Sequence, residues 1–274
     1  MDASQVPDSI APFIRIATHL RRLGFSAPEI LARDLESGLL LLEDFGDDTF
    51  ATLLADPERN EELFTLGTDV LIALHRLPQA IPENLRAYHP EKMLEDIELY
   101  VQWRTPHITA LEKEDFRAAW RTVLPLAHQV PESLLLRDYH VANLMLLPTR
   151  NGIQKAGLLD FQDAYRGPVT YDLISLLQDA RRDVSPVLQE KLLARYLAAF
   201  PELDRHAFET SVAILAAQRH TRVLGIFERL ARHEGKLDYR RLHSPRVERL
   251  LYQALQHPIL AEVKLWMERH ARTD

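Results

Sequence analysis

The sequence predicts an α+β protein in which helices make up most of the chain and strands are few and short. One long helix is indicated over about 205–233, where core-type positions recur at steps of 4, 3, 4, 4, 3 and 4 residues. These positions are Phe208, Val212, Leu215, Arg219, Val223, Ile226 and Leu230. Strand-like runs occur only near the start and the centre. We therefore expect two strands at the beginning, a long helical body and a small β insert.

The other elements follow in order along the chain. Further helical patterns lie at about 8–23, 47–55, 59–76, 90–103, 114–129, 170–182, 186–199, 245–256 and 258–270. Two apolar runs at 28–34 and 38–44 surround Glu36-Ser37-Gly38 and predict a hairpin. Central strands are expected at 133–136, 144–147 and 156–160, with a tight turn at Asn151-Gly152 between the last two. We find no internal repeat and no heptad run.

Composition and charge exclude several classes of protein. The 274 residues carry 33 basic and 40 acidic side chains, a net charge of −7, which disfavours a nucleic-acid partner. Zero cysteines exclude disulfides, thiolate catalysis and cysteine-based metal sites. The first residues show no signal peptide, and apolar runs such as 39–42 are too short to span a membrane. The expectation is a soluble cytoplasmic protein without a membrane partner.

Three polar side chains follow the central strands. Asp138 and Asn143 are five residues apart in a short loop, and Asp160 ends the third strand. Phosphoryl transfer needs such a set, because one carboxylate orients or deprotonates the attacking hydroxyl while an amide and a second carboxylate hold Mg²⁺. Asn143 and Asp160 offer the oxygen ligands that Mg²⁺ prefers. The pattern predicts a kinase site.

Each of these residues alone has an ordinary structural interpretation, because Asp and Asn are frequent in turns and caps. A D-x₄-N spacing also occurs by chance in many chains. The order of strand, loop, strand, turn and strand is what favours the kinase interpretation. Other catalytic classes find no support, since the chain has no G-x-x-x-x-G-K-[ST], no G-x-G-x-x-G and no H-E-x-x-H.

Two stretches carry a resemblance to a known family: R-D-Y-H-V-A-N at 137–143 and L-D-F-Q-D-A-Y-R-G-P-V-T-Y-D-L at 159–173. They resemble the aminoglycoside phosphotransferase and choline kinase superfamily, which consists of small-molecule kinases with a protein-kinase-like fold. The chain is more closely similar to one branch, the bacterial anomeric kinases that phosphorylate N-acetylmuramate and N-acetylglucosamine at C1 in cell-wall recycling. That closer match lies in 39–49, 160–172 and 218–239.

The resemblance implies roles for the matching residues. Asp138 would be the catalytic base, Asn143 and Asp160 would bind Mg²⁺, and Asp172 would brace the catalytic loop. The hinge that receives the adenine of ATP would be Leu41, Leu42, Glu43 and Asp44. Candidate substrate residues are Gln162, Asp163, Gln218, Arg219 and His220. For the last three, a packed polar network is the alternative interpretation.

The chain departs from the family pattern in two places. Leu136 stands where the family usually has a histidine before the catalytic Asp. The resembling kinases also cover the phosphates with glycine-rich first strands and usually place a basic residue on the third strand, but this chain has no glycine before Gly24 and no lysine before Lys92. We therefore expect a residual, truncated N-lobe over 1–45 and a helical C-lobe over 46–274, with the first strands missing.

These observations predict a small-molecule kinase that moves the γ-phosphoryl group of ATP, with Mg²⁺, to the hydroxyl of an amino sugar. Two alternatives stay open. A kinase for an aminoglycoside or a choline-type alcohol would use the same fold, because fold alone does not select the acceptor. A non-catalytic pseudokinase fragment is favoured by the missing glycine-rich cover, whereas the intact Asp138, Asn143 and Asp160 oppose it.

Overall fold

The computed structural model describes residues 1–2 and 10–270, which form two compact units. Unit 1 contains Met1–Ala87, Ser133–Leu177 and Ser185–Pro201. Unit 2 contains Tyr88–Glu132, Gln178–Val184 and Glu202–Asp274. This division follows contacts in space and differs from the division at residue 45 that the resemblance implied, which stays a prediction.

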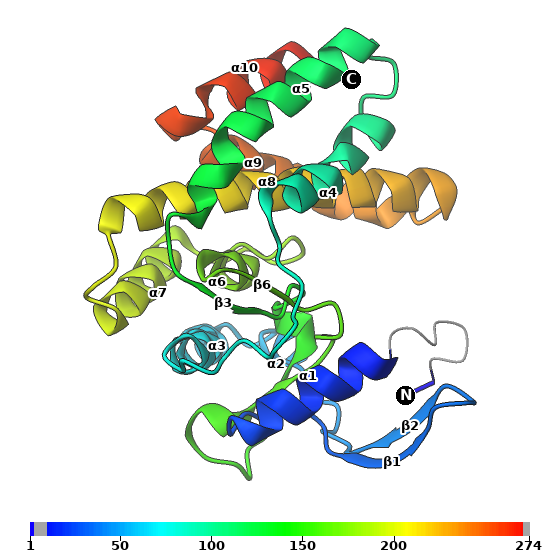
Figure 1. Ribbon diagram of the computed structural model, residues 1–274, viewed down its shortest axis with the longest axis vertical. Helices are drawn as coiled ribbons and strands as arrows, with labels where there is room; N and C mark the ends of the chain where they lie inside the picture. The colour runs from blue at the N-terminus through cyan, green and yellow to red at the C-terminus, as the bar shows by residue number, and fades with distance from the viewer. Residues whose placement is uncertain (3–9, 271–274) are drawn as a thin grey trace. The chain divides into compact units, whose positions relative to one another are not determined.

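Unit 1 combines helices with short strands (Figure 1). Its helices are α1 (Ile10–Arg22), α2 (Phe50–Leu53), α3 (Asn60–His75), α6 (Thr170–Leu177) and α7 (Pro186–Ala199), with short 3₁₀ turns at Pro57–Arg59, Val141–Asn143 and Gly152–Lys155. Its strands are β1 (Ile30–Asp34), β2 (Leu39–Leu42), β3 (Glu132–Leu135), β4 (Leu144–Leu146), β5 (Ala156–Leu158) and β6 (Tyr165–Pro168). The helix predicted at 8–23 is confirmed as α1, and its expected first two residues lie outside the described ones.

The predicted hairpin is confirmed near the N-terminus, where β1 and β2 pair antiparallel (Figure 1). Asp2 forms a bridge to Leu39 on the other edge of β2. The backbone of Met1 exchanges hydrogen bonds of 2.8 and 3.0 Å with Leu40. The N-terminal residues therefore extend the hairpin by one further backbone segment.

The central strands form two sheets where the sequence predicted one insert. β4 and β5 pair antiparallel, as expected for strands on either side of the Asn-Gly turn. That turn is longer than predicted, because Gly152 (φ +53°) begins a 3₁₀ turn that precedes β5. β3 pairs instead with β6, a strand that the sequence did not indicate. Its four residues include Gly167 and Pro168, which are unfavourable in strands.

Unit 2 is helical in its described residues, and its longest helix is the predicted one. Its helices are α4 (Pro90–Trp103), α5 (Ala110–Val123), α8 (Arg205–His233), α9 (Ser244–Ala254) and α10 (Ala261–His270), with a π-helical turn at Tyr239–His243 and 3₁₀ turns at Leu124–His128 and Pro258–Leu260. Asp204 caps α8 by accepting a hydrogen bond from the Ala207 amide at 2.8 Å. The predicted bounds of α7 and α8 match the structure.

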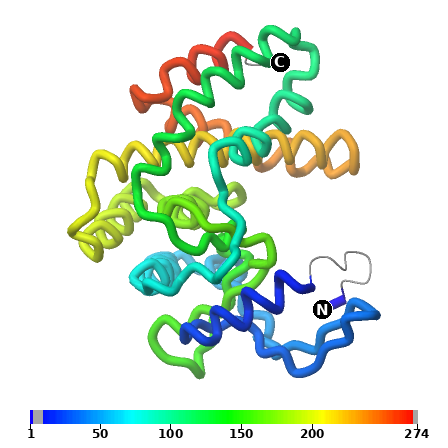
Figure 2. The backbone as a smooth tube through the Cα atoms, viewed as in Figure 1, coloured from blue at the N-terminus to red at the C-terminus, as the bar shows by residue number. Residues whose placement is uncertain are grey.

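The packing of α8 against α4 explains a glycine in the middle of a long helix (Figure 2). A Cβ on Gly225 would lie 2.5 Å from the backbone of Leu99 and Tyr100 in α4. Gly225 therefore permits two helix backbones to approach closely, which offsets its unfavourable helix propensity. In the described part of the chain, no helix is both long enough and apolar enough to cross a membrane.

Candidate active site

The loop after β3 carries the predicted catalytic base, Asp138, and its backbone is anchored by hydrogen bonds to Asp172. Both carboxylate oxygens of Asp172, at the start of α6, accept hydrogen bonds from the amides of Leu136 and Arg137 at 2.6 and 3.0 Å. Asp172 is fully buried. Arg137 adopts φ +68°, a left-handed conformation that is costly for a residue with a Cβ. These two hydrogen bonds fix the backbone immediately before Asp138.

A second contact anchors the same loop to α3. The hydroxyl of Tyr139 donates a 2.8 Å hydrogen bond to the carbonyl of Gly67. Burial, with a smaller contribution from the charge of Asp172, raises the pKa of Tyr139 well above its usual value. Tyr139 therefore stays protonated and keeps its role as donor. The residue after the predicted base is a structural anchor.

Asn143 and Asp160 are brought together, as the sequence predicted for a metal site. Asn143 Nδ2 donates to Asp160 Oδ2 at 3.1 Å and to the backbone carbonyl of Asp138 at 2.9 Å. Because both of these neighbours are oxygens, the amide nitrogen must face them, and Asn143 Oδ1 is the side-chain atom that can act as a metal ligand. Gln162 Nε2 donates to the other oxygen of Asp160 at 2.6 Å. The three residues form one hydrogen-bonded chain.

The position of Asp160 is fixed by its neighbour. Phe161 is fully buried and stacks on Phe13 of α1, with ring centroids 5.1 Å apart. Asp160 itself is exposed and has φ +57°. Packing of Phe161 therefore holds an exposed carboxylate in a strained backbone conformation, which is common at functional sites. The sequence predicted Asp160 at the end of a strand, but β5 ends two residues earlier, at Leu158.

The chemistry of this donor set fits a magnesium ion. An amide oxygen and a carboxylate from adjacent loops are the hard ligands that Mg²⁺ takes when substrate phosphates complete its shell. Among the described residues there is no group of three or more His, Cys, Asp or Glu side chains that could hold a metal ion.

The predicted hinge consists of the last two residues of β2, Leu41 and Leu42, and the two residues that follow it, Glu43 and Asp44. The backbone amide of Glu43 donates to the carbonyl of Glu29 at 2.8 Å, so this amide is already used within the hairpin. The Glu43 side chain forms ion pairs with Arg21 and Arg150. Asp44 Oδ1 accepts from the amide of Gly46 at 2.8 Å and shapes the turn that follows. Of the other two predicted residues, Leu41 is mostly exposed and Leu42 is half-buried.

Arg86 lies against the candidate substrate residue Asp163 and was not found from the sequence. Its Nη2 is 3.2 Å from Asp163 Oδ1, and its guanidinium lies 4.1 Å from the ring centroid of Tyr165. Arg137 contacts the same ring, at 4.9 Å. Both arginines therefore contact Tyr165 of β6, a strand that the sequence did not reveal. No local motif around Arg86 could have identified it.

The other candidate substrate residues lie in unit 2, in the middle of α8. Gln218 Nε2 donates to Tyr88 Oη and to the carbonyl of Met93, both at 3.0 Å. His220 Nε2 is 2.8 Å from Gln178 Oε1, and Arg219 Nη1 donates to the Gln178 carbonyl at 3.4 Å. Gln218 and His220 are fully buried. Burial, and secondarily the charge of Arg219, holds the pKa of His220 well below its usual value.

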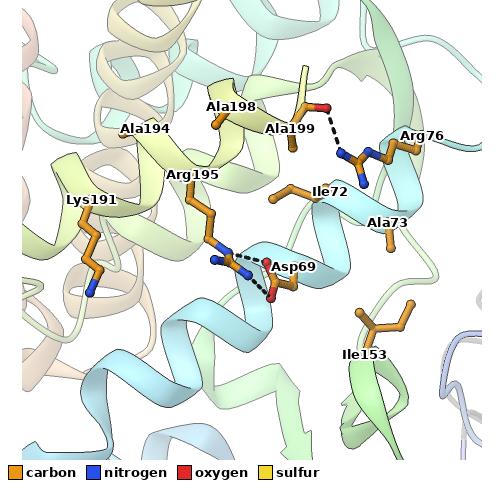
Figure 3. A pocket seen from close by; sticks show the side chains of 10 residues that line it. All are labelled: Asp69, Ile72, Ala73, Arg76, Ile153, Lys191, Ala194, Arg195, Ala198 and Ala199. Carbon is orange, nitrogen blue, oxygen red and sulfur yellow. Dashed lines mark hydrogen bonds and ion pairs between the residues drawn. The ribbon is translucent and has the colours of Figure 1, made fainter. Parts of the chain in front are cut away.

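A separate surface hollow of about 720 Å³ lies between α3 and α7 (Figure 3). Its polar groups are Asp69, Arg76, Lys191 and Arg195, and its walls are small or apolar. Arg195 forms a bidentate ion pair with Asp69 at 2.6 and 2.8 Å. None of the predicted site residues lines this hollow. The loops that carry Asp138, Asn143 and Asp160 remain the candidate active site, because they bring an amide and a carboxylate into contact.

Comparison with known proteins agrees with the prediction that the protein is a small-molecule kinase. The phosphotransferase enzyme family matches residues 2–208, and the chain therefore belongs to that family of small-molecule kinases. The chain is 37% identical to a protein named N-acetylmuramate/N-acetylglucosamine kinase from Caulobacter vibrioides, over 96% of this chain and 75% of the relative. It is 34% identical to a protein of the same name from Pseudomonas aeruginosa, over 96% of this chain and 79% of the relative.

Solved structures share the fold at lower sequence identity. A choline/ethanolamine kinase family protein from Mesorhizobium loti aligns with a TM-score of 0.63 at 18% identity, covering 93% of this chain and 84% of that one. The aminoglycoside phosphotransferase APH(2″)-IIa, in a ternary complex with streptomycin and ATP, aligns with a TM-score of 0.55 at 15% identity. That alignment covers 79% of this chain and 75% of the other. The expected kinase-like fold is confirmed.

Proposed function

We propose that the protein transfers the γ-phosphoryl group of ATP to the C1 hydroxyl of N-acetylmuramate or N-acetylglucosamine, as a step of cell-wall recycling. The observation that carries the proposal is the hydrogen-bonded chain of Asn143 and Asp160, joined directly to the backbone of Asp138. The names of the curated relatives support the choice of acceptor. The ATP in the APH(2″)-IIa complex supports the choice of donor.

In this proposal Asp138 accepts the proton of the attacking hydroxyl. Its loop is fixed by Asp172 and Tyr139, which hold the backbone on either side of Asp138. Positioning of this kind supplies much of the rate enhancement in phosphoryl transfer, because little covalent chemistry is left to the protein. Asp138 orients the acceptor oxygen in line with the phosphorus and takes its proton as the bond forms.

Asn143 and Asp160 would hold Mg²⁺ through Asn143 Oδ1 and the Asp160 carboxylate. When bound, Mg²⁺ neutralises charge on the phosphates of the nucleotide. Gln162 keeps Asp160 oriented, since its amide donates to the carboxylate oxygen that Asn143 does not use. Leu41 to Asp44 would receive the adenine. Gln162, Asp163, Gln218, Arg219 and His220 stay the proposed substrate residues.

The proposal is tested by incubating the purified protein with Mg²⁺–ATP and each amino sugar and measuring sugar 1-phosphate and ADP in equal amounts. Choline and an aminoglycoside serve as competing acceptors. We expect product only with the amino sugars. Faster turnover of choline or the aminoglycoside would reject the proposed acceptor. Binding of Mg²⁺–ATP and sugar with no product from any acceptor would favour the pseudokinase alternative.

A separate measurement tests the metal residues. Mg²⁺ and ATP together should raise the melting temperature more than the sum of either alone, because Mg²⁺ binds through the phosphates as well as through the protein. Asp160→Ala should remove this excess while leaving the melting temperature without ligand nearly unchanged, since Asp160 is exposed. An equal excess in Asp160→Ala would reject the assignment. Asp163→Ala is the matched control from the same loop.

A further inference from the structure

The Arg86 backbone is fixed beside the active-site loop by strand-like pairing. Ala87 forms a parallel bridge with Arg166 in β6, and the Arg166 amide donates to the Arg86 carbonyl at 2.9 Å. β6 begins two residues after Asp163. The segment that carries Arg86 is therefore connected to the loop that begins with Asp160, although 74 residues separate the two in sequence (160 − 86).

The Arg86 guanidinium is oriented by two different contacts. Arg86 Nη2 lies 3.2 Å from Asp163 Oδ1, and Arg86 Cζ lies 4.1 Å from the ring centroid of the buried Tyr165. The Arg86 side chain is still 57% exposed and that of Asp163 is 65% exposed. A guanidinium has five N–H donors in a rigid fork, and a single contact with Asp163 leaves donors for a further anion. Arg86 is thus an oriented and accessible cation.

The two amino sugars of the proposed function differ in the chemical group that Arg86 and Asp163 would recognise. N-acetylmuramate carries a lactyl ether with a carboxylate, whereas N-acetylglucosamine carries a neutral hydroxyl at that position. A guanidinium attracts the carboxylate and can bind it through two parallel hydrogen bonds. The Asp163 carboxylate repels the same group but accepts a hydrogen bond from a hydroxyl. The two side chains therefore favour different sugars.

We infer that Arg86 and Asp163 set the preference of this enzyme between the acidic and the neutral amino sugar, with Arg86 binding the lactyl carboxylate. The inference rests on the proposed function and adds a specificity-determining residue to it. Asp163 holds Arg86 in place when the neutral sugar is bound, and the acidic sugar draws part of the guanidinium to itself. Neither residue takes part in phosphoryl transfer.

An exposed ion pair can also be a surface contact of no functional consequence. The pair of Arg195 and Asp69 is the appropriate comparison, because its arginine is 50% exposed and its geometry is bidentate (Figure 3). It joins α3 to α7 and lines the hollow that contains none of the predicted site residues. If any exposed arginine affected the two sugars differently through general electrostatic attraction, Arg195 would do so as well. The Arg195→Gln variant is therefore the matched control.

The test measures kcat/KM for both sugars at saturating Mg²⁺–ATP. The quantity compared is the kcat/KM for N-acetylmuramate divided by the kcat/KM for N-acetylglucosamine. Arg86→Gln should lower this ratio roughly tenfold, the size of one charge-assisted hydrogen bond at a partly exposed site. Asp163→Asn should change it in the opposite direction, raising it roughly threefold because the repulsion is lost. Arg86→Lys should give an intermediate ratio, since it keeps the charge and loses the fork.

The control variant and each remaining result have a separate meaning for the inference. Arg195→Gln should leave the ratio unchanged, and thermal melting should show that all variants fold. A ratio that stays constant in Arg86→Gln and Asp163→Asn, or that changes equally in Arg195→Gln, overturns the inference. If the unsubstituted protein phosphorylates neither sugar, the proposed function fails. The inference is then judged on the two dissociation constants measured by calorimetry, and an unaltered ratio or an absence of binding overturns it.

Discussion

The two units place polar candidate site residues in opposite settings. In unit 1, Asp160 is exposed on a loop and its backbone is strained at φ +57°. In unit 2, Gln218 and His220 are fully buried within the 29 residues of α8. The Asp160 carboxylate accepts hydrogen bonds from Asn143 and Gln162, and its backbone is held by the packing of the neighbouring Phe161 on Phe13. The helix residues are held by their own hydrogen bonds.

This difference has an energetic consequence. Removing an exposed loop carboxylate costs little folding free energy, because water replaces its partners. Removing a buried polar group leaves its partners unsatisfied and costs a desolvation penalty as well. Substitutions in the unit 1 loops should therefore affect activity and spare stability. Substitutions of buried polar groups in unit 2 should do the reverse, and four measurements test this contrast.

The largest expected effect is the loss of turnover in Asp138→Asn. An amide cannot accept the proton of the acceptor hydroxyl, so kcat should fall by roughly 10²–10⁴. The melting temperature should change little, because Asp172 and Tyr139 hold this loop independently of the Asp138 side chain. Steady-state kinetics and thermal melting on one preparation give both values. Near-normal kcat would reject Asp138 as the base, and a large loss of stability would contradict the contrast between the units.

The second effect concerns Glu228, a fully buried carboxylate of α8 in unit 2. It pairs with Arg232, and it lies 3.8 Å from Arg104 Nη1 and 3.6 Å from Arg240 Nε. Glu228→Gln removes the charge on which three arginines converge, and breaking a buried ion pair in this way costs about 3 kcal/mol. Urea denaturation should detect this loss.

A matched control for Glu228 lies six residues further along the chain. Glu234 is exposed and pairs with Lys236 at 2.8 Å. Glu234→Gln removes the same charge from the same region without burial, so its denaturation midpoint should stay unchanged. Equal midpoints for both variants would show that burial of Glu228 contributes nothing to stability.

Periodicity predicted the helices well because it reflects burial. Both ends of α8 were predicted correctly from the steps of 3 and 4 residues. The burial of α8 extends beyond that series, because buried residues lie on most sides of the helix, whereas Val212, Ile226 and Leu230 are only half-buried. The Asp138, Asn143 and Asp160 set was recognisable because all three lie within 23 residues of one another (160 − 138 + 1). Local sequence was sufficient for these features.

β6 and Arg86 could not be predicted, for a common reason. β6 depends on its pairing with β3, since two of its four residues, Gly167 and Pro168, disfavour strands. Arg86 reaches Asp163 because Ala87 pairs with Arg166, 79 residues away (166 − 87). Contacts of this kind form only when distant segments fold together. The sequence gives no local pattern for them.

The third prediction compares the units through His75, which is half-buried, and His220, which is fully buried. Burial lowers the pKa of His75 in unit 1 to about 3, and it also lowers the pKa of His220 in unit 2. Both imidazoles are neutral in the folded protein, so protonation favours the unfolded chain. Their contribution to stability is fully present above the unfolded pKa of about 6.5 and is lost progressively as the pH falls.

The expected slope for His75 is about 1.4 kcal/mol per pH unit, or about 2 kcal/mol between pH 6.5 and pH 5. His75→Gln keeps a hydrogen-bonding partner for Tyr196, which lies 2.7 Å from His75 Nδ1, and should reduce the slope of unfolding free energy against pH. The exposed His206 provides the control, because His206→Gln should leave the slope unchanged. A slope that is identical in all three proteins would mean that His75 is not buried as a neutral group.

The smallest effect concerns Gln218 and separates the two interpretations of α8. Both donor contacts of Gln218 are made within unit 2, but its buried Oε1 has no hydrogen-bond partner among the described residues. Such an acceptor is costly unless water or a ligand supplies the missing donor. If the sugar supplies it, Gln218→Leu should raise KM for the sugar roughly fivefold, the value of one neutral hydrogen bond, with kcat nearly unchanged. Thr210, also buried in α8, offers the matched control Thr210→Val, which should leave KM unaltered. If Gln218→Leu lowers the melting temperature and leaves KM at its original value, Gln218 is part of a packed network, and the contrast between an active loop region and a purely structural α8 is strengthened.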